Sequence, residues 1–425
     1  MSNQHHHLNV YVHEQAVGRL ARSTDTERAT VFAYQDAVAT EAAIALAMPV
    51  VWEPYVWDQG LHPIFEMNMP EGALRDELMR RFSKAIKGFD DFALLSVVGQ
   101  HQLGRLRVST GPLADTPPES SVADLLVHDG AKDLFADLLS TYAQYSGVSG
   151  VQPKVLLRDV GQDVERVTQK GATHIVKTWR EGEYNELAAN EFFCMRAAMH
   201  AGIPVPEFQL SATGKLLVVT RFDLAESGYL GHEDFCVLSA FNTGQKYDGT
   251  HEGIARLIKA YVSPAHVSEA LLVYFKMVAL SAGVQNGDAH LKNFGVLYDH
   301  AGDDGNVWLS PAYDLVSTTP YIPKDTFALQ LGGSKAWPKE KMLVRFGRTA
   351  CGLTEGVCKR ALEEVADGIA KALAELVDYQ KGHDSFEVVG EAMQRAWNAG
   401  VARSLLAEGR AVVVDMAPGD SQGRE

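Results

Sequence analysis

Two carboxylates and an asparagine are concentrated in one polar stretch of this chain. The run NGDAHLKNFG, residues 286–295, follows a long apolar segment, and SPAYDL, residues 310–315, comes soon after it. Phosphoryl transfer needs an acidic base that orients a hydroxyl, and an Asn and a second Asp that hold Mg²⁺ against a triphosphate. The stretch therefore predicts a kinase active site, with Asp288 as the base and Asn293 and Asp314 as the Mg²⁺ ligands.

A plain turn is the alternative for these residues. Asn, Gly and Asp are common in turns for conformational reasons alone, and Asp314 could cap a helix. However, Asp288, His290, Lys292 and Asn293 fall within six positions directly after the apolar helix, and a turn needs no such set. We expect His290 to brace the catalytic loop by hydrogen bonding, and Lys292 either to stabilise the transferring group or to remain solvated.

A second block upstream has the properties of a phosphate-binding loop. It comprises YSGVSGVQPKVLL, residues 145–157, and THIVK, residues 173–177. Its glycines let backbone N–H groups approach a phosphate, and its lysines can offset the phosphate charge. The loop matches neither GxxxxGK[ST] nor GxGxxG, so a hairpin turn with solvated lysines is the alternative. The expected nucleotide-binding residues are Gly150, Val151, Gln152, Lys154 and Lys177.

In this order, the blocks resemble the HipA family of serine/threonine kinases, the toxins of HipA/HipB toxin–antitoxin pairs. The motifs that carry the resemblance are SGVQPK (149–154), HIVK (174–177), NEFFCMRAAMHAGIPVP (190–206), RFD (221–223), GDAHLKNF (287–294) and PAYDL (311–315). Together with an N-terminal stretch like the family's own, they cover nearly the whole chain. The resemblance implies ATP and Mg²⁺ as cofactors.

The resemblance also implies an α+β, two-lobed, protein-kinase-like fold. Its parts are a small β-rich N-terminal lobe, an extra N-terminal subdomain and a mainly α-helical C-terminal lobe. We expect the N-terminal subdomain at 1–110, the nucleotide-covering lobe at 122–225, the catalytic lobe at 226–410 and a disordered tail at 411–425. Residues 109–121 are rich in Pro, Ser, Thr and acidic residues, which predicts a linker. The opening third shows no evident chemistry.

Hydrophobic periodicity predicts the elements of each part. In the opening third these are a β-hairpin at 8–20, a helix at 73–81, and a helix end followed by a strand within 92–108. The small lobe should contain a helical segment at 122–146, strands at 154–158 and 174–177, a helix at 186–201 capped by Gly202, and a hairpin at 204–223. The large lobe should contain helices at 253–262 and 362–379, a helix that starts at Ser263-Pro264 and reaches 282, and strands at 294–297 and 307–309.

Two further groups are expected at the nucleotide. Glu191 is the expected partner of Lys177, by analogy with the kinase Lys–Glu ion pair; Glu186 is a lesser candidate, and a solvated glutamate is the alternative. Kinase-like folds bind adenine through the main chain where a strand leaves the small lobe. The hinge candidates there are Thr220, Arg221 and Phe222, although Phe222 could belong to the core.

The target and the self-modification follow from the resemblance alone. HipA-type toxins act on translation, with aminoacyl-tRNA synthetases as the known kind of target, and they inactivate themselves by phosphorylating a serine in or before the glycine loop. Ser149 is the best candidate here and Ser146 the next, while Gly147 stands where some relatives have the serine. A kinase of a small-molecule hydroxyl and a non-catalytic partner of a DNA-binding repressor are the alternatives.

Charge and composition limit the partners. A net charge of −15 disfavours direct DNA binding, which relies on clustered Lys and Arg, so contact with DNA should come through a basic companion. The resemblance implies that this companion is a HipB-like antitoxin. The four cysteines show no CxxC spacing, which fits a reduced cytoplasm better than a zinc site or a disulfide framework. No apolar run is long enough to span a membrane. No function is assigned to the histidines at 5–7.

Overall fold

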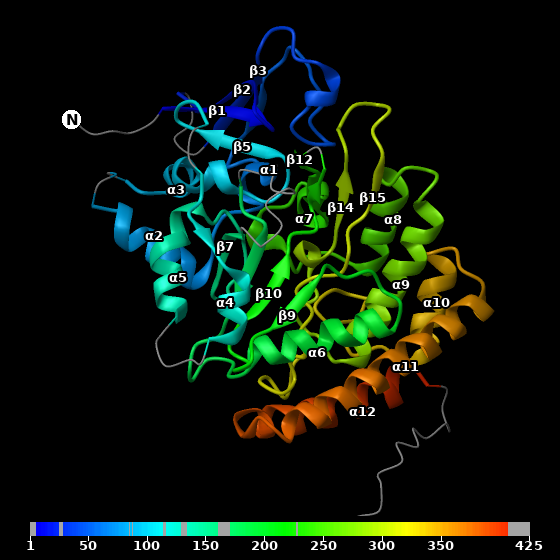
Figure 1. Ribbon diagram of the computed structural model, residues 1–425. Helices are drawn as coiled ribbons and strands as arrows, with labels where there is room; N and C mark the ends of the chain where they lie inside the picture. Colours follow the sequence, from blue (N-terminus) through cyan, green and yellow to red (C-terminus); the bar gives the residue numbers. More distant parts are fainter. Residues whose placement is uncertain are drawn as a thin grey trace, which may run out of the picture.

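An antiparallel five-stranded sheet of order β4-β3-β2-β1-β5 begins the chain (Figure 1). Its strands are β1 (His7–Val12), β2 (Gln15–Arg22), β3 (Thr30–Tyr34), β4 (Tyr55–Trp57) and β5 (Leu106–Ser109). Apolar residues alternate along β1, so Leu8, Val10 and Val12 are buried on one face. The predicted hairpin is confirmed, with Val12 paired to Gln15. The computed structural model describes residues 6–24, 29–84, 86, 88–113, 116–128, 134–159, 171–226 and 228–406.

Short helices pack on this sheet and complete the N-terminal subdomain. They are η1 (Thr40–Ala42), α1 (Pro63–Glu66), α2 (Gly72–Phe82), α3 (Asp91–Val98) and η2 (Gly99–His101). The predictions of a helix at 73–81 and of a helix followed by a strand within 92–108 are confirmed. Phe65, Leu78 and Leu94 from these helices share a core with Leu8 and Phe32 of the sheet.

A second five-stranded sheet, of order β6-β7-β8-β10-β9, forms the small lobe. Its strands are β6 (Glu119–Ser120), β7 (Lys154–Asp159), β8 (His174–Lys177), β9 (Phe208–Leu210) and β10 (Leu217–Thr220). The helices α4 (Val122–Val127) and α5 (Leu134–Tyr142) cover one face of it, followed by η3 (Ala143–Tyr145). The linker predicted at 109–121 ends in a strand, because β6 pairs parallel with β7 and Glu119 binds Arg158 at 2.9 Å. Most of the connection between β7 and β8 lies outside the described residues.

The helix α6 (Leu187–His200) joins the small lobe to the large lobe. The predicted cap is confirmed, since Gly202 has a φ of +68° and its N–H donates to the carbonyl of Met199. Phe193 of α6 is buried in the same core as Phe275, Ile369 and Trp397 of the large lobe. This shared core fixes the two lobes against each other.

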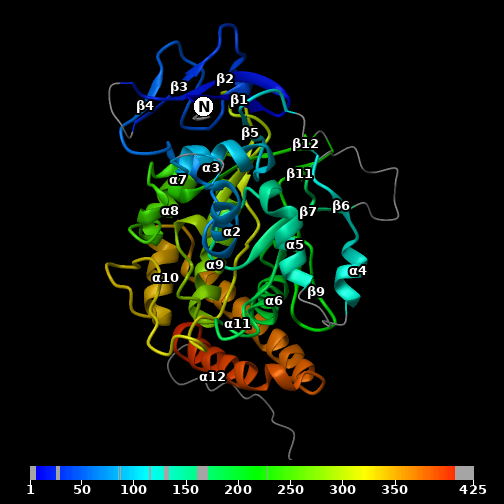
Figure 2. The same cartoon turned by 90° about the vertical axis from the view of Figure 1, so that its left-hand side faces the viewer.

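The large lobe is mainly helical. Its helices are α7 (Phe235–Leu238), η5 (Thr243–Gln245), α8 (His251–Tyr261), α9 (Val267–Gly283), η6 (Leu291–Asn293), α10 (Glu340–Thr349), α11 (Glu355–Gln380), η7 (Asp384–Phe386) and α12 (Glu387–Ser404). Its strands are β11 (Leu224–Ala225), β12 (Gly228–Tyr229), β13 (Gly231–Asp234), β14 (Gly295–Tyr298) and β15 (Val307–Leu309). The N-terminal sheet and the α11–α12 pair lie at opposite ends of the molecule (Figure 1, Figure 2). The expected two-lobed α+β fold is confirmed.

Two helix predictions for the large lobe were wrong in their bounds. The helix predicted to start at Ser263-Pro264 begins at Val267 instead, because Oγ of Ser263 accepts a hydrogen bond from the N–H of Val307 (2.9 Å) rather than capping a helix. The helix predicted from Leu362 begins at Glu355, after Oγ1 of Thr354 caps it. Within the described ranges, no helix combines the length and apolar content needed to cross a bilayer.

Candidate active site

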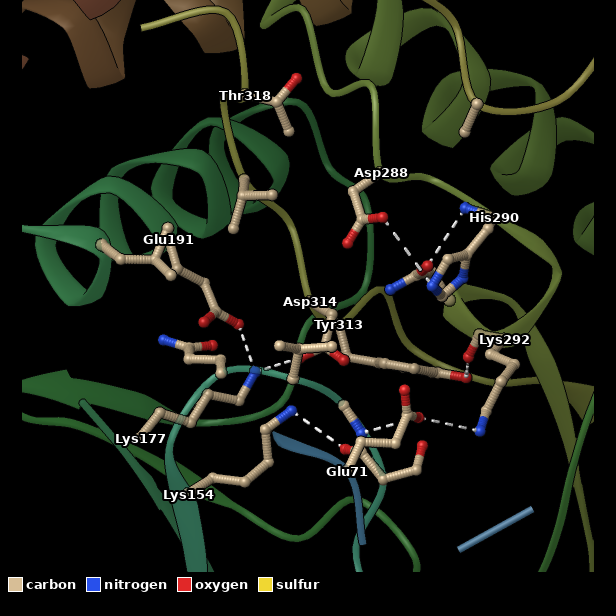
Figure 3. A pocket seen from close by; sticks show the side chains of 18 of the residues that line it. Glu71, Lys154, Lys177, Glu191, Asp288, His290, Lys292, Tyr313, Asp314 and Thr318 are labelled. Atoms are coloured by element: carbon tan, nitrogen blue, oxygen red, sulfur yellow. Dashed lines mark hydrogen bonds and ion pairs between the residues drawn. The ribbon is translucent and has the colours of Figure 1, made fainter. Parts of the chain in front are cut away.

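A cavity of about 590 Å³ lies between the two lobes, and residues of the N-terminal subdomain also reach it. Ligand pockets typically have volumes of roughly 300–1,000 Å³, so a nucleotide fits this size. Of the residues predicted for the site, most line the cavity: Ser149, Gly150, Val151, Gln152, Lys154, Lys177, Glu191, Phe222, Asp288, His290, Lys292, Asn293 and Asp314. Residues from motifs far apart in the sequence are thus brought to one place (Figure 3).

The loop between α9 and β14 is braced and not a simple turn. The N–H of Gly287 donates to Oγ1 of Thr318 (2.9 Å), and that of Asp288 donates to Oδ1 of Asn286 (3.0 Å). A side chain at position 287 has no room, because a Cβ there would lie 2.0 Å from Oδ2 of Asp325. These contacts fix the direction in which the Asp288 carboxylate leaves the loop.

The Asp288 carboxylate faces the cavity and is half exposed. Its Oδ1 accepts a hydrogen bond from the hydroxyl of Tyr247, which shows that a hydroxyl donor can reach this oxygen. Burial raises the pKa of Asp288 above its usual value. Tyr247 was not predicted from the sequence, because it is a single aromatic residue far from any motif.

His290 and Asn293 hold the end of this loop. The N–H of His290 donates to Oδ1 of Asn293 at 3.1 Å, and the N–H of Asn293 donates back to the carbonyl of His290 at 3.0 Å. Burial, followed by the charges of Lys246 and Lys292, lowers the pKa of His290 to about 3. The ring is therefore neutral near pH 7, and its Nε2 lies 3.9 Å from Oδ1 of Asp288.

Lys177 joins the lobes through two carboxylates. Its Nζ donates to Oε1 of Glu191 at 2.5 Å and to Oδ1 of Asp314. The strand β8 supplies the lysine, α6 supplies Glu191, and the segment after β15 supplies Asp314, which caps no helix and has a φ of 52°. The partner on α6 is therefore Glu191 and not Glu186.

The charges of Lys177, Glu191 and Asp314 depend on one another. Burial raises the pKa of Glu191, and the nearby Lys177 lowers it only in part. Burial also acts to raise the pKa of Asp314, but Lys177 and Lys154 outweigh it and hold this pKa well below its usual range. Asp314 is thus ionised and keeps its negative charge toward the cavity, as a metal ligand must.

The glycine loop lies over the cavity from the small lobe. Gly150 has a φ of +111°, and a Cβ on it would lie 2.3 Å from Nζ of Lys154, so the loop needs glycine here. That Nζ donates to the carbonyl of Ser149 at 3.0 Å. The hydroxyl of Ser146, by contrast, is fully buried and donates to the carbonyl of Tyr142 at 2.8 Å.

The hinge candidates divide into two groups. Phe222 lines the cavity, with its ring stacked on Tyr313 at 5.1 Å between centroids. Thr220 and Arg221 lie outside the cavity lining, and the Arg221 side chain is buried against Asp223 at 2.6 Å. The N–H groups of Thr220 and Arg221 donate to carbonyls of neighbouring segments, so they are already occupied.

Sequence reasoning missed several charged residues that line the cavity, among them Glu71 and Lys246. Glu71 comes from the opening third, which showed no evident chemistry in the sequence, yet its carboxylate lies 3.6 Å from both Lys292 and Lys246. No motif surrounds either residue. The packing of the N-terminal subdomain against the lobes brings Glu71 to the cavity, and the fold of the large lobe after η5 brings Lys246.

The donor set suits Mg²⁺. Asn293 and Asp314 offer an amide oxygen and a carboxylate, the hard oxygen ligands that this ion prefers. In the part of the chain that the structure describes, no cluster of three or more His, Cys, Asp or Glu residues could hold a metal by itself. Mg²⁺ in phosphoryl-transfer sites is held by one or two protein ligands together with phosphate oxygens, so the two residues fit this ion.

Comparison with protein families gives two matches that follow each other along the chain without overlap. The HipA N-terminal domain matches residues 8–109. The HipA-like C-terminal domain matches residues 146–373, more than half of the 425 residues. The second match contains the glycine loop, Lys177 and the two aspartates of the cavity.

Curated relatives and solved structures agree with these matches. The chain is 28% identical over 354 residues to "Putative kinase Y4dM" of Sinorhizobium fredii, covering 77% of this chain and 81% of the relative. It is 26% identical over 400 residues to "Putative kinase Y4mE" of the same organism, covering 87% and 92%. HipA in the Shewanella oneidensis MR-1 complex of HipA, HipB and operator DNA has a TM-score of 0.68 at 20% identity over 94% of this chain and 97% of that chain, a likeness of fold.

Proposed function

This chain belongs to the HipA family, and we propose that it is an ATP-dependent serine/threonine protein kinase that acts as the toxin of a HipA/HipB-type toxin–antitoxin pair. The observation that carries the proposal is the arrangement across the cavity, where Lys177 binds Glu191 and Asp314 while Asp288 faces the same space (Figure 3). Kinases use this combination to align a triphosphate with a hydroxyl. The names of the two curated relatives support the same activity.

Each cavity residue then has a task that its position supports. Asp288 accepts the proton of the substrate hydroxyl at the oxygen that Tyr247 now contacts. Lys177 binds the α- and β-phosphates, and Lys292 stabilises the transferring group. Asn293 and Asp314 would hold Mg²⁺, which would neutralise phosphate charge during the transfer.

The glycine loop and Phe222 account for nucleotide binding. Val151 and Gln152 bring backbone N–H groups close to the phosphates, the glycine at position 150 gives the loop its conformation, and Lys154 offsets the phosphate charge. Adenine lies near Phe222, whose ring lines the cavity. Because the N–H groups of Thr220 and Arg221 are occupied, the base must use a carbonyl here or the Phe222 ring itself.

We further propose that the kinase inactivates itself on Ser149. This residue lines the cavity, whereas Ser146 has a buried hydroxyl that also accepts from the N–H of Leu156 at 2.8 Å. Phosphate on Ser149 adds about two negative charges beside the triphosphate site, so the loop should not return to it. Incubation with ATP should therefore add one phosphate to Ser149 and lower nucleotide affinity, as mass spectrometry and a binding titration can measure. Active enzyme that stays unmodified at both serines would contradict this proposal.

The target and the partner come from the family. A component of translation is the proposed substrate, with an aminoacyl-tRNA synthetase as the expected class. A HipB-like antitoxin is the proposed partner, because the similar solved HipA is held with HipB and operator DNA. The net charge of −15 supports contact with DNA only through such a basic companion.

Transfer of label from γ-labelled ATP tests the function. Purified protein is incubated in a cell lysate, and the labelled product is separated and identified by mass spectrometry. A labelled translation protein, absent with Asp288→Asn, supports the toxin kinase. Label on a small molecule would favour a metabolic kinase, and no label with the folded, unphosphorylated protein would favour a non-catalytic partner of a repressor.

A further inference from the structure

Two adjacent residues of the N-terminal subdomain contact the glycine loop. Oε1 of Glu71 accepts a hydrogen bond from the N–H of Gly150 at 3.2 Å. The next residue, Gly72, packs its backbone on Val151, and a Cβ on Gly72 would lie 2.5 Å from the carbonyl oxygen of Val151. Gly72 also has a φ of +50°, which favours glycine. The start of α2 is thus fitted closely to the loop.

The Glu71 carboxylate is itself held by charge. Its Oε1 lies 3.6 Å from Nζ of Lys292, and its Oε2 lies 3.6 Å from Nζ of Lys246. The Lys292 side chain is only 6% exposed, and its Nζ has no hydrogen-bond partner among the residues that the structure describes. Burial acts to raise the pKa of Glu71, but Lys292, Lys246 and Lys154 outweigh it and hold the pKa below its usual value. Glu71 is therefore ionised and fixed in place.

We propose that Glu71 is a positioning residue for phosphoryl transfer: it holds the glycine loop in the place where the loop covers the nucleotide. The inference rests on the proposed kinase function, since that function gives the loop its role. Figure 3 shows the Glu71 side chain between Lys154 and Lys292, on the side of the cavity opposite Asp288. The N-terminal subdomain thereby becomes part of the nucleotide site.

The alternative is that Glu71 competes with phosphate for the same lysines. The two roles predict opposite effects of Glu71 on ATP binding. A docking residue strengthens ATP binding, whereas a competitor weakens it. The contact of Gly72 with Val151 favours docking, because it adds a second link between α2 and the loop that involves no lysine.

Amide hydrogen exchange tests the docking without any nucleotide. In Glu71→Ala the peptide that covers residues 147–153 should exchange faster, because the N–H of Gly150 loses its acceptor. Glu71→Gln keeps an acceptor oxygen and should restore most of the protection. Glu77→Ala is the matched control, because Glu77 lies on the same helix and pairs with Arg80 at 2.7 Å, away from the cavity. Unchanged exchange in folded Glu71→Ala would overturn the proposal.

Kinetics then connect docking to the reaction. Glu71→Ala should raise KM for ATP about tenfold or more, the size of one lost hydrogen bond to a charged group, and should change kcat much less. Glu71→Gln should lie near the wild type, and Glu77→Ala should match it. A lower KM in Glu71→Ala would identify a competitor and overturn the proposal. If the wild type itself transfers no phosphate, the kinase function fails, while the exchange result still judges the docking.

Discussion

Arg221 and Lys177 are both buried cations with carboxylate partners, but their surroundings differ. The Arg221 guanidinium binds both oxygens of Asp223, at 2.6 and 3.0 Å, and also donates to the carbonyls of Ala172 and Gln102. Oδ2 of Asp223, the oxygen at 2.6 Å from the guanidinium, also accepts a hydrogen bond from the N–H of Gly104 at 2.6 Å. Neither partner lines the cavity, and the pair locks the N-terminal subdomain to the small lobe.

The Lys177 group opens onto the cavity. The Asp314 side chain is 34% exposed there, and Oε2 of Glu191 has no hydrogen-bond partner among the described residues. A buried ion pair whose hydrogen-bonding capacity is filled resists change, whereas one with spare capacity beside a cavity can exchange partners when a ligand enters. Burial of charge alone therefore does not distinguish the two ion pairs; spare hydrogen-bonding capacity next to the cavity does.

The largest effect is expected from the open group. Asp314→Ala or Asp288→Asn should lower phosphoryl transfer by roughly 10²- to 10⁴-fold or more, because the first removes the proposed metal ligand and the second the proposed base. Both should stay folded, since both side chains face the cavity and not a core. Label transfer and circular dichroism measure the two properties. Near-normal transfer by folded Asp314→Ala would contradict its role at the metal.

Changes to the Arg221–Asp223 pair, which lies away from the cavity, should lower the stability of the protein rather than its activity. Asp223→Ala leaves the Arg221 charge buried without its carboxylate, which typically costs about 3–5 kcal/mol of unfolding free energy. Urea denaturation measures this loss. Asp314→Ala is the matched comparison, because it removes the carboxylate partner that Lys177 has at the cavity. Equal losses of unfolding free energy in Asp223→Ala and Asp314→Ala would show that the distinction between the pair away from the cavity and the pair beside it is wrong.

Much of this arrangement could be predicted from the sequence, because the motifs are local. The periodicity of β8 and α6 and the glycine cap of α6 gave these elements close to their true bounds. Lys177, Glu191 and Asp314 were expected at one site, and they line one cavity. Local signals suffice where neighbouring residues determine the conformation.

The rest depends on packing between distant segments. Glu71 reaches the cavity from the N-terminal subdomain and Tyr247 from a distant segment of the large lobe, and no residue near either one in the sequence signals it. Ser263 resembles a helix cap in sequence, but β15 offers it a better partner. Arg221 follows the hinge strand, yet its side chain turns into the subdomain interface, so its sequence position suggested the wrong neighbour.

A smaller effect should distinguish Lys177 from Lys154, two of the lysines that line the cavity. ATP with Mg²⁺ should raise the melting temperature, because a ligand present at about 100 times its Kd stabilises the native state by about 2.7 kcal/mol. Lys177→Ala should reduce this response, whereas Lys215→Ala, at an exposed position of the same lobe, should not. A full response in Lys177→Ala would mean that Lys154 carries the phosphates and that Lys177 belongs with the structural pairs.

The smallest effect concerns Glu233, a carboxylate that is buried away from the cavity and has no hydrogen-bonded cation among the described residues. Its Oε1 accepts from the N–H of Leu46 at 2.7 Å and from the hydroxyl of Tyr298 at 2.8 Å, which again joins the N-terminal subdomain to the large lobe. Burial raises the pKa of Glu233 to about 7. The folded protein therefore holds this proton more tightly than the unfolded chain does, so the stability it contributes is present at low pH.

The contribution of Glu233 to stability should disappear as the pH rises through its pKa in the folded protein. Between pH 6 and pH 8 the wild type should lose about 1 kcal/mol of unfolding free energy at this one site, since the unfolded glutamate is already ionised there. Glu233→Gln cannot ionise and should lack this part of the slope, which urea denaturation at the two pH values measures. If the unfolding free energies of the wild type and Glu233→Gln change in parallel with pH, Glu233 is ionised in the folded protein. A carboxylate buried away from the cavity would then need neither a proton nor an arginine partner.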